Sequence, residues 1–378
     1  MLLEIHMLKN YPPVNLNRDE SGAPKSCFFG GVQRGRISSQ CLKRSWRTSE
    51  VFKNLGSYGI RTRRMPERVA NQLTEWGIEP EFVEEAKIKL TGIANKEGKT
   101  SADGVTGQIV FYASNEIDRI AQRIKEMIEE DKTIKAFKER SPKELHSLLE
   151  DAKINPITAD IALFGRMVTS SYFKDVDASM QVAHAISTHA VNRESDYFTA
   201  VDDLLAAQDE QGAGMIGDID YNSCCYYEYA SLDTDALRSN LENVENKDEL
   251  IEKLLPVLLR AMAMSNPSGK QNTFAGHVLP DFVMVECKKD KIPLSYVNAF
   301  EEPVNAWGSS PRIVKNSIDK LIRQVNVMDN AYELPVLHRA CFAPAYEEKQ
   351  SLAQGEWMDK FSQVAQVCVN WLNEVDQA

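Results

Sequence analysis

The hydrophobic pattern changes character along this chain of 378 residues. Residues 2–8 alternate between apolar and polar side chains, which is the period of a β-strand. From about residue 65 to about residue 160, long charged runs repeat their apolar positions with the period of an α-helix. These runs are Glu81–Leu90, Glu116–Lys138 and Pro142–Ala152, with a Gly-, Lys- and Ser-rich loop at Gly92–Gly107. This pattern indicates a helical insertion between strand-bearing segments.

The segments on either side of this insertion carry their own signals. Residues 11–31 are rich in Pro, Gly and Asn and predict a loop. Ser38 and Ser39 predict the start of a helix that continues to about Glu50, whose inward stripe is Leu42, Ser45 and Trp46. Residues 194–223 are polar and acidic and predict a long hairpin. Beyond it we expect strands at Ser223–Ser231 and Ala275–Glu286, and helices at Asn246–Met264, Ser317–Val327 and Trp357–Val375.

Cysteine usage and hydropathy favour a cytoplasmic protein. The chain contains seven cysteines and no Cys-x-x-Cys pair, a pattern typical of reduced, buried thiols rather than a disulfide framework. No stretch approaches the ~20 apolar residues of a membrane span. The N-terminal segment lacks the basic region of a signal peptide. We therefore expect cytoplasmic localisation and no membrane partner.

Charge is distributed unevenly along the chain. Residues 1–64 contain 12 Lys or Arg and 4 Asp or Glu, a formal charge of +8, whereas the remaining residues carry 32 and 51, or −19. The net charge of −11 alone would argue against nucleic acid. Such asymmetry instead indicates a basic binding face on an acidic body, with chance clustering of surface charge as the alternative.

Residues 17–47 combine three features that are typical of phosphate-binding sites. Glycines at positions 30, 31 and 35 would let backbone N–H groups approach a ligand closely. Ser38 opens a helix whose N-terminus favours anions. Gln40, Lys43 and Arg47 share a face of that helix, where they could follow the phosphates of an extended strand. The alternative is an ordinary solvated helix face preceded by a glycine turn.

Seven segments resemble, in order, the CasC family, the repeated backbone subunit of Cascade, the type I-E CRISPR surveillance complex. The first two are Leu16-Asn-Arg-Asp and Phe29-Gly-Gly-Val-Gln-Arg-Gly-Arg-Ile-Ser-Ser-Gln-Cys-Leu-Lys-Arg. The others are Asp160-Ile-Ala-Leu-Phe-Gly-Arg-Met, Val182-Ala-His-Ala-Ile-Ser-Thr-His, Asp196-Tyr-Phe-Thr-Ala-Val-Asp-Asp-Leu, Gly269-Lys-Gln-Asn-Thr-Phe-Ala and Pro293-Leu-Ser-Tyr-Val-Asn-Ala-Phe. Each motif alone is weak, but their combination across most of the chain is specific.

The resemblance implies a hand-like α+β architecture. A modified RRM-type (ferredoxin-like) palm would comprise residues 1–59, 182–193 and 223–378. Helical fingers would span residues 60–181, and a protruding β-hairpin thumb would span residues 194–222. Several copies would stack along one guide RNA. The thumb of each copy would cross the RNA held by its neighbour, kinking it and flipping out a base at regular intervals.

The resemblance also implies a function without catalysis. The chain would coat CRISPR guide RNA and present it for pairing with a target DNA strand, beside other Cascade subunits and a nuclease-helicase that acts separately. Residues expected to hold guide phosphates are Arg18, Lys25, Ser38, Gln40, Lys43, Arg44 and Arg47. Arg166 and Met167 would line the finger side, where Met167 could wedge against a base. Tyr197, Phe198 and Thr199 would contact nucleotides at the thumb base, and Lys270 is a weaker candidate.

Other chemistry is weakly supported. The chain lacks the aromatic RNA-binding signature of RRM domains, so RNA binding should depend on the shape and charge of the RNA backbone. That suits a protein that accepts any guide. His184 and His189 are five apart and lack zinc-type partners, so we interpret both as structural. Asp202, Asp203, Asp218 and Asp220 are interpreted as a solvated hairpin rather than a metal site. We expect no cofactor, metal or catalytic residue.

Asp19 raises the main alternative. An aspartate beside Arg18 in a loop at an RNA groove could support metal-dependent RNA cleavage, and related backbone subunits of other CRISPR types use such a residue. Alternatively, Asp19 pairs with Arg18 or Lys25 and orders the loop, which we favour. A weaker hypothesis is a scaffold whose basic face binds an acidic protein.

Overall fold

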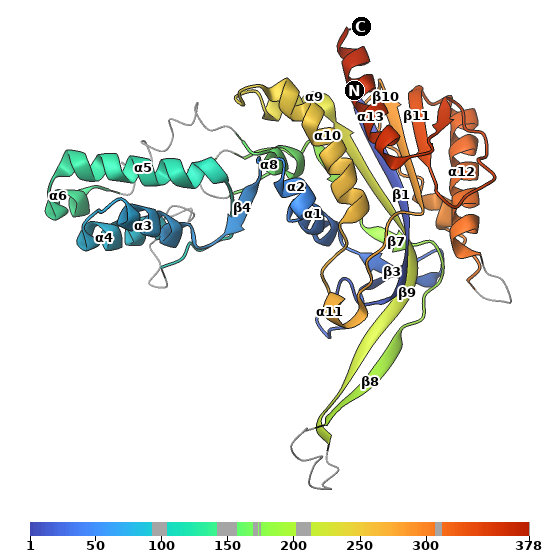
Figure 1. Cartoon of the computed structure of the whole chain (residues 1–378), viewed down its shortest axis with the longest axis horizontal. Coiled ribbons are helices and arrows are strands. Elements are labelled where there is room, and N and C mark those ends of the chain that lie inside the picture. Colours follow the sequence, from blue (N-terminus) through green and yellow to red (C-terminus); the bar gives the residue numbers. More distant parts are fainter. Residues whose placement is uncertain are drawn as a thin grey trace. The chain divides into compact units, whose positions relative to one another are not determined.

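The protein forms two compact units. The computed structural model describes residues 1–92, 104–141, 157–168, 173, 175–201, 213–306 and 312–377. Unit 1 comprises Met1–Phe52, Gln181–Asp233 and Leu255–Ala378, and unit 2 comprises Lys53–Met180 and Thr234–Leu254 (Figure 1). Among the described residues, no helix is both long enough and apolar enough to cross a membrane.

Unit 1 is built on a large mixed sheet with β1 (Leu2–Val14) in its interior. The described strands run in the order β12-β11-β10-β1-β9-β7-β3-β2. Their bounds are β2 Ser26–Phe29, β3 Val32–Ile37, β6 Met180–Val182, β7 Ala185–Ser187, β9 Ala213–Asp233, β10 Phe282–Lys288, β11 Val336–Phe342 and β12 Gly355–Trp357. Neighbours pair antiparallel except β11 with β12. This confirms the α+β class predicted from the sequence.

The first strand is longer than its alternating pattern predicted. The segment after residue 10 was expected to be loop, yet β1 continues to Val14 and two further strands, β2 and β3, follow. Pro12 and Pro13 fall where the pairing of β1 with β9 shifts register, between Tyr11 and Val14. Proline has no N–H to donate to a ladder, so the irregularity accommodates both residues within one strand.

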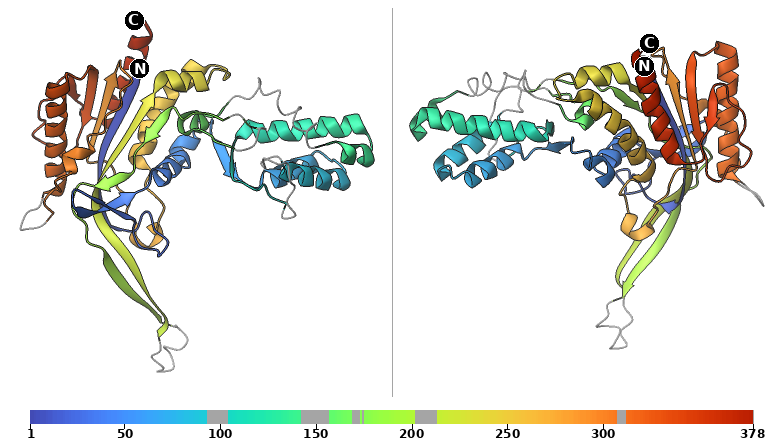
Figure 2. Two further views of the ribbon diagram at one scale, coloured as in Figure 1. Left: turned by 180° about the vertical axis from the view of Figure 1, so that it is seen from behind. Right: turned by 45° about the horizontal axis from the view of Figure 1, so that its top comes forward.

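Both faces of the central strands are buried. Leu3, Ile5 and Met7 point to one face and are at most 3% exposed. On the other face, Leu8 belongs to a core cluster that includes Tyr227 from β9 and residues of α12 (Ile313–Tyr332). Helix α13 (Phe361–Gln377) contacts β10 and β11 (Figure 2).

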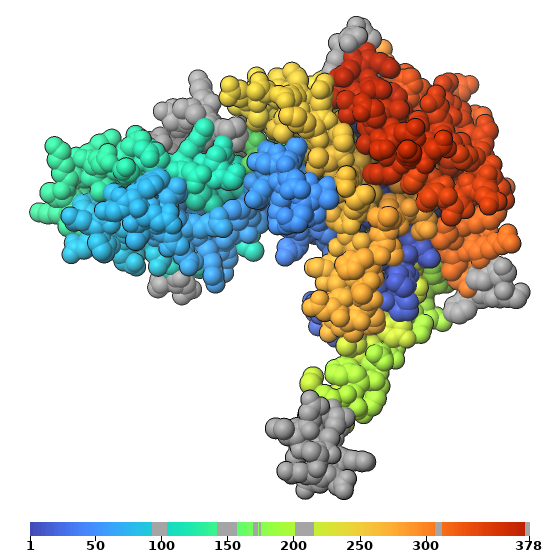
Figure 3. Space-filling model, in the orientation of Figure 1, coloured from blue at the N-terminus to red at the C-terminus, as the bar shows by residue number. Residues whose placement is uncertain are grey.

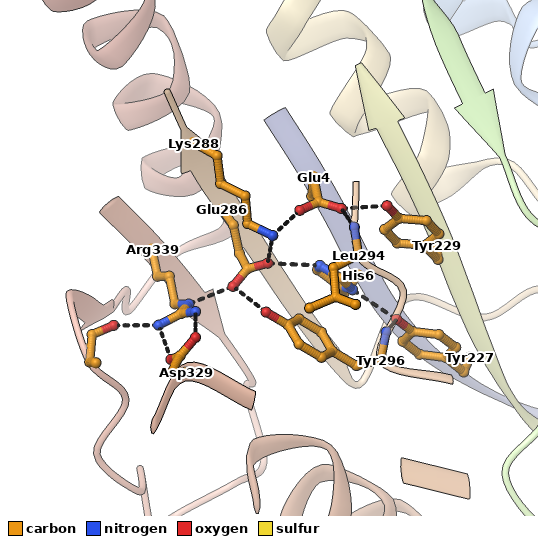
Figure 4. Close-up of polar contacts among 11 residues, drawn as sticks. Glu4, His6, Tyr227, Tyr229, Glu286, Lys288, Leu294, Tyr296, Asp329 and Arg339 are labelled. Atoms are coloured by element: carbon orange, nitrogen blue, oxygen red, sulfur yellow. Dashed lines mark hydrogen bonds and ion pairs between the residues drawn. The ribbon is translucent and has the colours of Figure 1, made fainter. Parts of the chain in front are cut away.

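A polar network is sealed within this core (Figure 4). Glu286 accepts from His6 Nε2 at 3.3 Å and from Arg339 Nε at 2.5 Å. Arg339 also donates to Asp329 at 2.6 and 2.7 Å, and Glu4 pairs with Lys288. Buried charges are tolerated when each has a partner. The polar positions of β1 therefore face a charged core rather than water.

Unit 2 is mainly helical. Its described helices include α3 Met65–Glu75, α4 Pro80–Thr91, α5 Ser114–Asp131, α6 Ile134–Glu139, α8 Ala159–Phe164 and α9 Thr234–Asn240, and β4 Gly59–Thr62 pairs with β5 Val110–Ala113. Leu73, Phe82, Ile124 and Phe137 are among the side chains of its core. The expected helix Pro142–Ala152 lies outside the described residues, as does most of the loop at Gly92–Gly107.

Several predicted boundaries need correction. The run Glu116–Lys138 is two helices, because Lys132 adopts a left-handed conformation (φ 57°) at the end of α5 and Thr133 caps α6. The strand expected from residue 275 begins at Phe282, after Pro280, which cannot donate a ladder hydrogen bond. The remaining expected helices are present as α10 (Lys247–Met264), α12 and α13.

The acidic segment contains an antiparallel ribbon. Strand β8 (Glu194–Val201) pairs with the first part of β9, from Glu194 opposite Tyr221 to Val201 opposite Ala213. Figures 1 and 2 show this ribbon extending beyond the main sheet of unit 1. The second part of β9 pairs with β1, so one strand serves both structures.

Candidate nucleic-acid interface

Helix α1 (Ser39–Arg47) is oriented by its apolar side. Leu42 and Trp46 are each 1% exposed and anchor it on unit 1. Ser38 is the N-cap, since its Oγ accepts from Cys41 N at 3.3 Å, and its own N–H donates to Asn17 Oδ1 at 2.9 Å. The cap and the inward stripe match the sequence-based prediction. The opposite side of the helix is left for polar residues.

That opposite side carries the predicted phosphate-binding side chains of α1. Gln40 and Arg44 are exposed, and Lys43 and Arg47 are half-buried. Basic residues in the last turn also suit the negative end of the helix dipole. The helix therefore presents three positive charges on one surface.

A groove of about 660 Å³ runs beside α1 in unit 1. Arg18 and Arg44 line it, opposite the segment Met264–Gly269. Figure 3 shows α1 and the segment around α11 (Gln271–Phe274) side by side on one face. Tyr11 Oη donates to Asn266 Oδ1 at 2.7 Å, which fixes the far wall.

Lys25 and Lys270 sit at the edges of this region. Lys25 is half-buried, and its N–H donates to Asn17 O at 2.8 Å. Lys270 is also half-buried and has a left-handed backbone (φ 50°) at the start of α11. Its neighbour Gly269 lines the groove so closely that a Cβ there would lie 2.3 Å from Leu16 O.

Two glycines of the predicted phosphate loop pack closely against other parts of the chain. A Cβ on Gly30 would lie 1.7 Å from Glu301 O, and one on Gly35 would lie 2.6 Å from Cys224 Sγ. The β2–β3 turn is further tied down by Arg34, a buried side chain that donates to carbonyls including Phe29 O, at 3.1 Å. Gly30 and Gly35 therefore permit close packing within the chain, whereas a Cβ on Gly31 would meet nothing within 4 Å.

Asp19 orders its own loop. Its Oδ1 accepts from Ser21 N, Ser21 Oγ and Ala23 N at 2.9, 2.7 and 3.1 Å. The Ser21 hydroxyl, followed by these backbone groups and the charge of Arg193, lowers the pKa of Asp19. Within the described residues, no group of three or more His, Cys, Asp or Glu side chains could hold a metal ion. Asp202 and Asp203 lie outside them. The geometry favours a loop-ordering role for Asp19, but its carboxylate accepts from Ser21 and Ala23 rather than from the expected Arg18 or Lys25.

Arg166 and Met167 have opposite environments in unit 2. The Arg166 side chain is 4% exposed and donates from Nη1 to both oxygens of Glu116 at 2.8 Å. Met167 is 91% exposed. Arg166 pairs with Val176 in an isolated bridge, which holds the backbone next to Met167. The guanidinium thus supports this segment, and Met167 is the member of the pair that faces outward.

The three ribbon residues differ in exposure. Tyr197 is 65% exposed and lies opposite Asp218, whereas Phe198 is half-buried against Gly217. Thr199 is exposed. Aromatic and hydroxyl side chains at such positions can stack on bases or bond to sugars.

Sequence reasoning missed one surface residue. His184 was interpreted as structural, yet it is exposed and receives a hydrogen bond from Arg36 Nη1 at 2.9 Å. His189 is structural as expected, because it is 5% exposed and its Nε2 accepts from Cys225 N. No local pattern could have identified the contact between Arg36 and His184, since 148 residues separate them.

Comparisons with known proteins match nearly the whole chain. The sequence profile of the CT1975-like protein family matches residues 3–367. A chain of a solved "CRISPR RNA-guided surveillance complex, pre-nicking" has 26% identity and a TM-score of 0.83, with 98% of this chain and 100% of that chain covered. A chain of another "CRISPR RNA-guided surveillance complex" has 22% identity and a TM-score of 0.73 at the same coverage, which shows a shared fold. No curated protein matches.

Proposed function

This chain belongs to the CT1975-like protein family, and on that premise we propose that it is a non-catalytic RNA-binding backbone subunit of a CRISPR surveillance complex. Its similarity to chains of such complexes extends over 98% of its length and supports a Cascade-type role. The resemblance to the CasC family stated from the sequence is thereby confirmed.

The observation that carries the RNA-binding proposal is the basic side of α1 beside the groove of unit 1. Arg44 belongs to both surfaces, and Arg18 lines the groove from the preceding loop. Lys43 and Arg47 lie one turn apart on the helix. The chain as a whole has a net charge of −11. A local basic surface on such an acidic body attracts a polyanion. Contacts to phosphates hold register without reading sequence.

The finer parts of the proposal concern assembly. Residues 1–59, 182–193 and 223–378 would form an RRM-type palm, residues 60–181 the fingers and residues 194–222 the thumb. Copies would stack along one guide RNA, with Tyr197, Phe198 and Thr199 near the RNA of a neighbour and Met167 against a base. The guide would pair with target DNA, and a separate nuclease-helicase would cut that DNA.

Co-purification with the operon partners tests this proposal. The absorbance ratio at 260 and 280 nm is measured first, and any bound RNA is then sequenced. One RNA of uniform length with repeat-derived ends is the expected result. A protein-like ratio without RNA would refute the proposal and favour binding of an acidic protein, a contact that should then survive ribonuclease treatment.

A cleavage assay on bound RNA distinguishes the non-catalytic role from the alternative of a metal-dependent ribonuclease. Asp19 offers one carboxylate, and one of its oxygens accepts three hydrogen bonds from its own loop. We therefore expect bound RNA to stay intact with magnesium, both in the native protein and in Asp19→Ala. Magnesium-dependent cleavage that Asp19→Ala abolishes would contradict a non-catalytic role.

A further inference from the structure

Three basic groups from separate segments of unit 1 meet beside α1. Arg36 lies in β3, His184 lies between β6 and β7, and Lys25 precedes β2. Strand β3 pairs with β7, with Arg36 opposite Ile186, which brings the first two together. Arg36 N donates to Lys25 O at 2.9 Å, which places the third next to them.

The hydrogen bond between Arg36 and His184 defines the protonation of the free site. Arg36 Nη1 lies 2.9 Å from His184 Nδ1. A guanidinium has no acceptor, so it must donate, and Nδ1 must carry its lone pair. The proton of the neutral ring is then on Nε2. His184 is exposed, so this side of the pair is open to a ligand.

Protonation of His184 in the free protein is unfavourable. A proton on Nδ1 would remove the acceptor of Arg36 and set two positive charges against each other. Partial burial, followed by the charges of Arg36 and Lys25, lowers the pKa of His184. An anion bound beside the imidazole and the guanidinium would reverse this balance, because it would accept from both groups.

From this geometry we infer that Arg36, His184 and Lys25 form a further phosphate-binding site for the guide RNA, in which phosphate binding is coupled to protonation of His184. The inference rests on the proposed RNA-binding function. One non-bridging oxygen would accept from Arg36 and another from the imidazolium of His184. Lys25 would add charge from the loop that also carries Arg18.

The site lies next to the surface already described. Asn17 accepts from Lys25 N through its carbonyl and from Ser38 N through its side chain, at 2.8 and 2.9 Å. Lys25 and the cap of α1 are therefore held by one residue. A strand that follows the α1 face could continue onto Arg36 and His184 without crossing the apolar core. The phosphate path would then extend from α1 to the start of β7.

The test measures RNA affinity against pH. The purified full-length chain is titrated into a fluorescently labelled single-stranded oligo-uridine, and Kd is read from anisotropy between about pH 8 and about pH 5.5, the range in which histidine changes charge. His184→Gln keeps polarity but cannot gain a proton. His338→Gln is the matched control, because His338 is a second histidine on the surface of unit 1, 45% exposed and paired with Glu374.

The expected result is a pH dependence that only the His184 variant loses. Binding by the native chain and by His338→Gln should tighten as pH falls, by up to about tenfold if phosphate raises the pKa of His184 by about one unit. His184→Gln should match the native affinity at high pH and remain flat. Arg36→Gln should weaken binding at every pH, because it removes a charge that is always present.

The outcomes separate this inference from the proposed function. If the native chain binds no RNA at any pH, the proposed function itself fails. If it binds RNA and His184→Gln retains the native pH dependence, the coupling to His184 is wrong. Unchanged affinity in Arg36→Gln would likewise overturn the site while leaving RNA binding through α1 intact.

Discussion

Arg166 and Glu116 form a buried ion pair in unit 2, with Arg166 Nη1 2.8 Å from both carboxylate oxygens and both side chains 4% exposed. Glu116 also accepts from Ala113 N at 2.7 Å, where it closes the first turn of α5. Arg166 was expected to line an RNA surface. Its observed position makes it a support for the segment that carries Met167.

Arg166→Ala should therefore destabilise the protein strongly. It leaves Glu116 buried without its charged partner, which typically costs about 3–5 kcal/mol of unfolding free energy. Urea unfolding followed by circular dichroism measures this loss. Met167→Ala is the matched control at the next position, and its effect should stay within about 0.5 kcal/mol because the side chain is exposed. A similar stability for both variants would argue against a structural role of the pair.

Glu286 should make unit 1 sensitive to acid. Burial raises the pKa of Glu286. The hydrogen bond and charge of His6, together with the charges of Arg339 and Lys288, outweigh this effect and lower that pKa from 4.5 to about 2. A depressed pKa contributes stability that is complete above the unfolded value and is lost as pH falls from about 4.5 towards about 2. The urea midpoint of the native chain should fall across this window.

Glu286→Gln tests the assignment of this acid sensitivity. The variant should be less stable near neutral pH, because it leaves Arg339 short of one carboxylate. It should also lose less stability than the native chain between about pH 4.5 and about pH 2. An equal acid-induced loss in both proteins would assign the effect to other carboxylates.

Lys43→Ala with Arg47→Ala should weaken RNA binding without regard to sequence. Each lost phosphate contact lowers the slope of log K against log salt by about 0.7 for a single strand, so the pair should lower it by about 1.4. Affinities at several salt concentrations for two unrelated RNAs measure this. Lys291→Ala with Lys349→Ala removes the same charge from unit 1 at side chains that are each 45% exposed. An unchanged slope in the α1 variant would show that this helix face does not contact RNA.

Gly30→Ala and Gly31→Ala should differ although the residues are adjacent. Both have positive φ, 59° and 77°, which strains any L side chain by about 1–2 kcal/mol. A Cβ on Gly30 also meets Glu301 O, whereas one on Gly31 meets nothing within 4 Å. We expect Gly30→Ala to lower the thermal midpoint clearly more than Gly31→Ala. Equal midpoints would mean that the turn does not pack against Glu301.

Local sequence was sufficient for the features of α1. The Ser38 cap, the buried Leu42 and Trp46 and the basic face all follow from spacing within one short segment, because helix capping and amphipathicity are local properties. The same holds for the helical character of unit 2 and the antiparallel ribbon of β8 and β9. Family membership also followed from short segments in a fixed order.

Tertiary structure decided which polar residues are buried. His6 meets Glu286 across 280 residues of sequence, and Arg36 meets His184 across 148. Arg166 and Met167 are neighbours in sequence, yet one is sealed against Glu116 and the other faces outward. A residue's charge is visible in the sequence, but its burial and its partner depend on which distant segments pack against it. The environment that sets the role of a charge is therefore known only once the chain is folded.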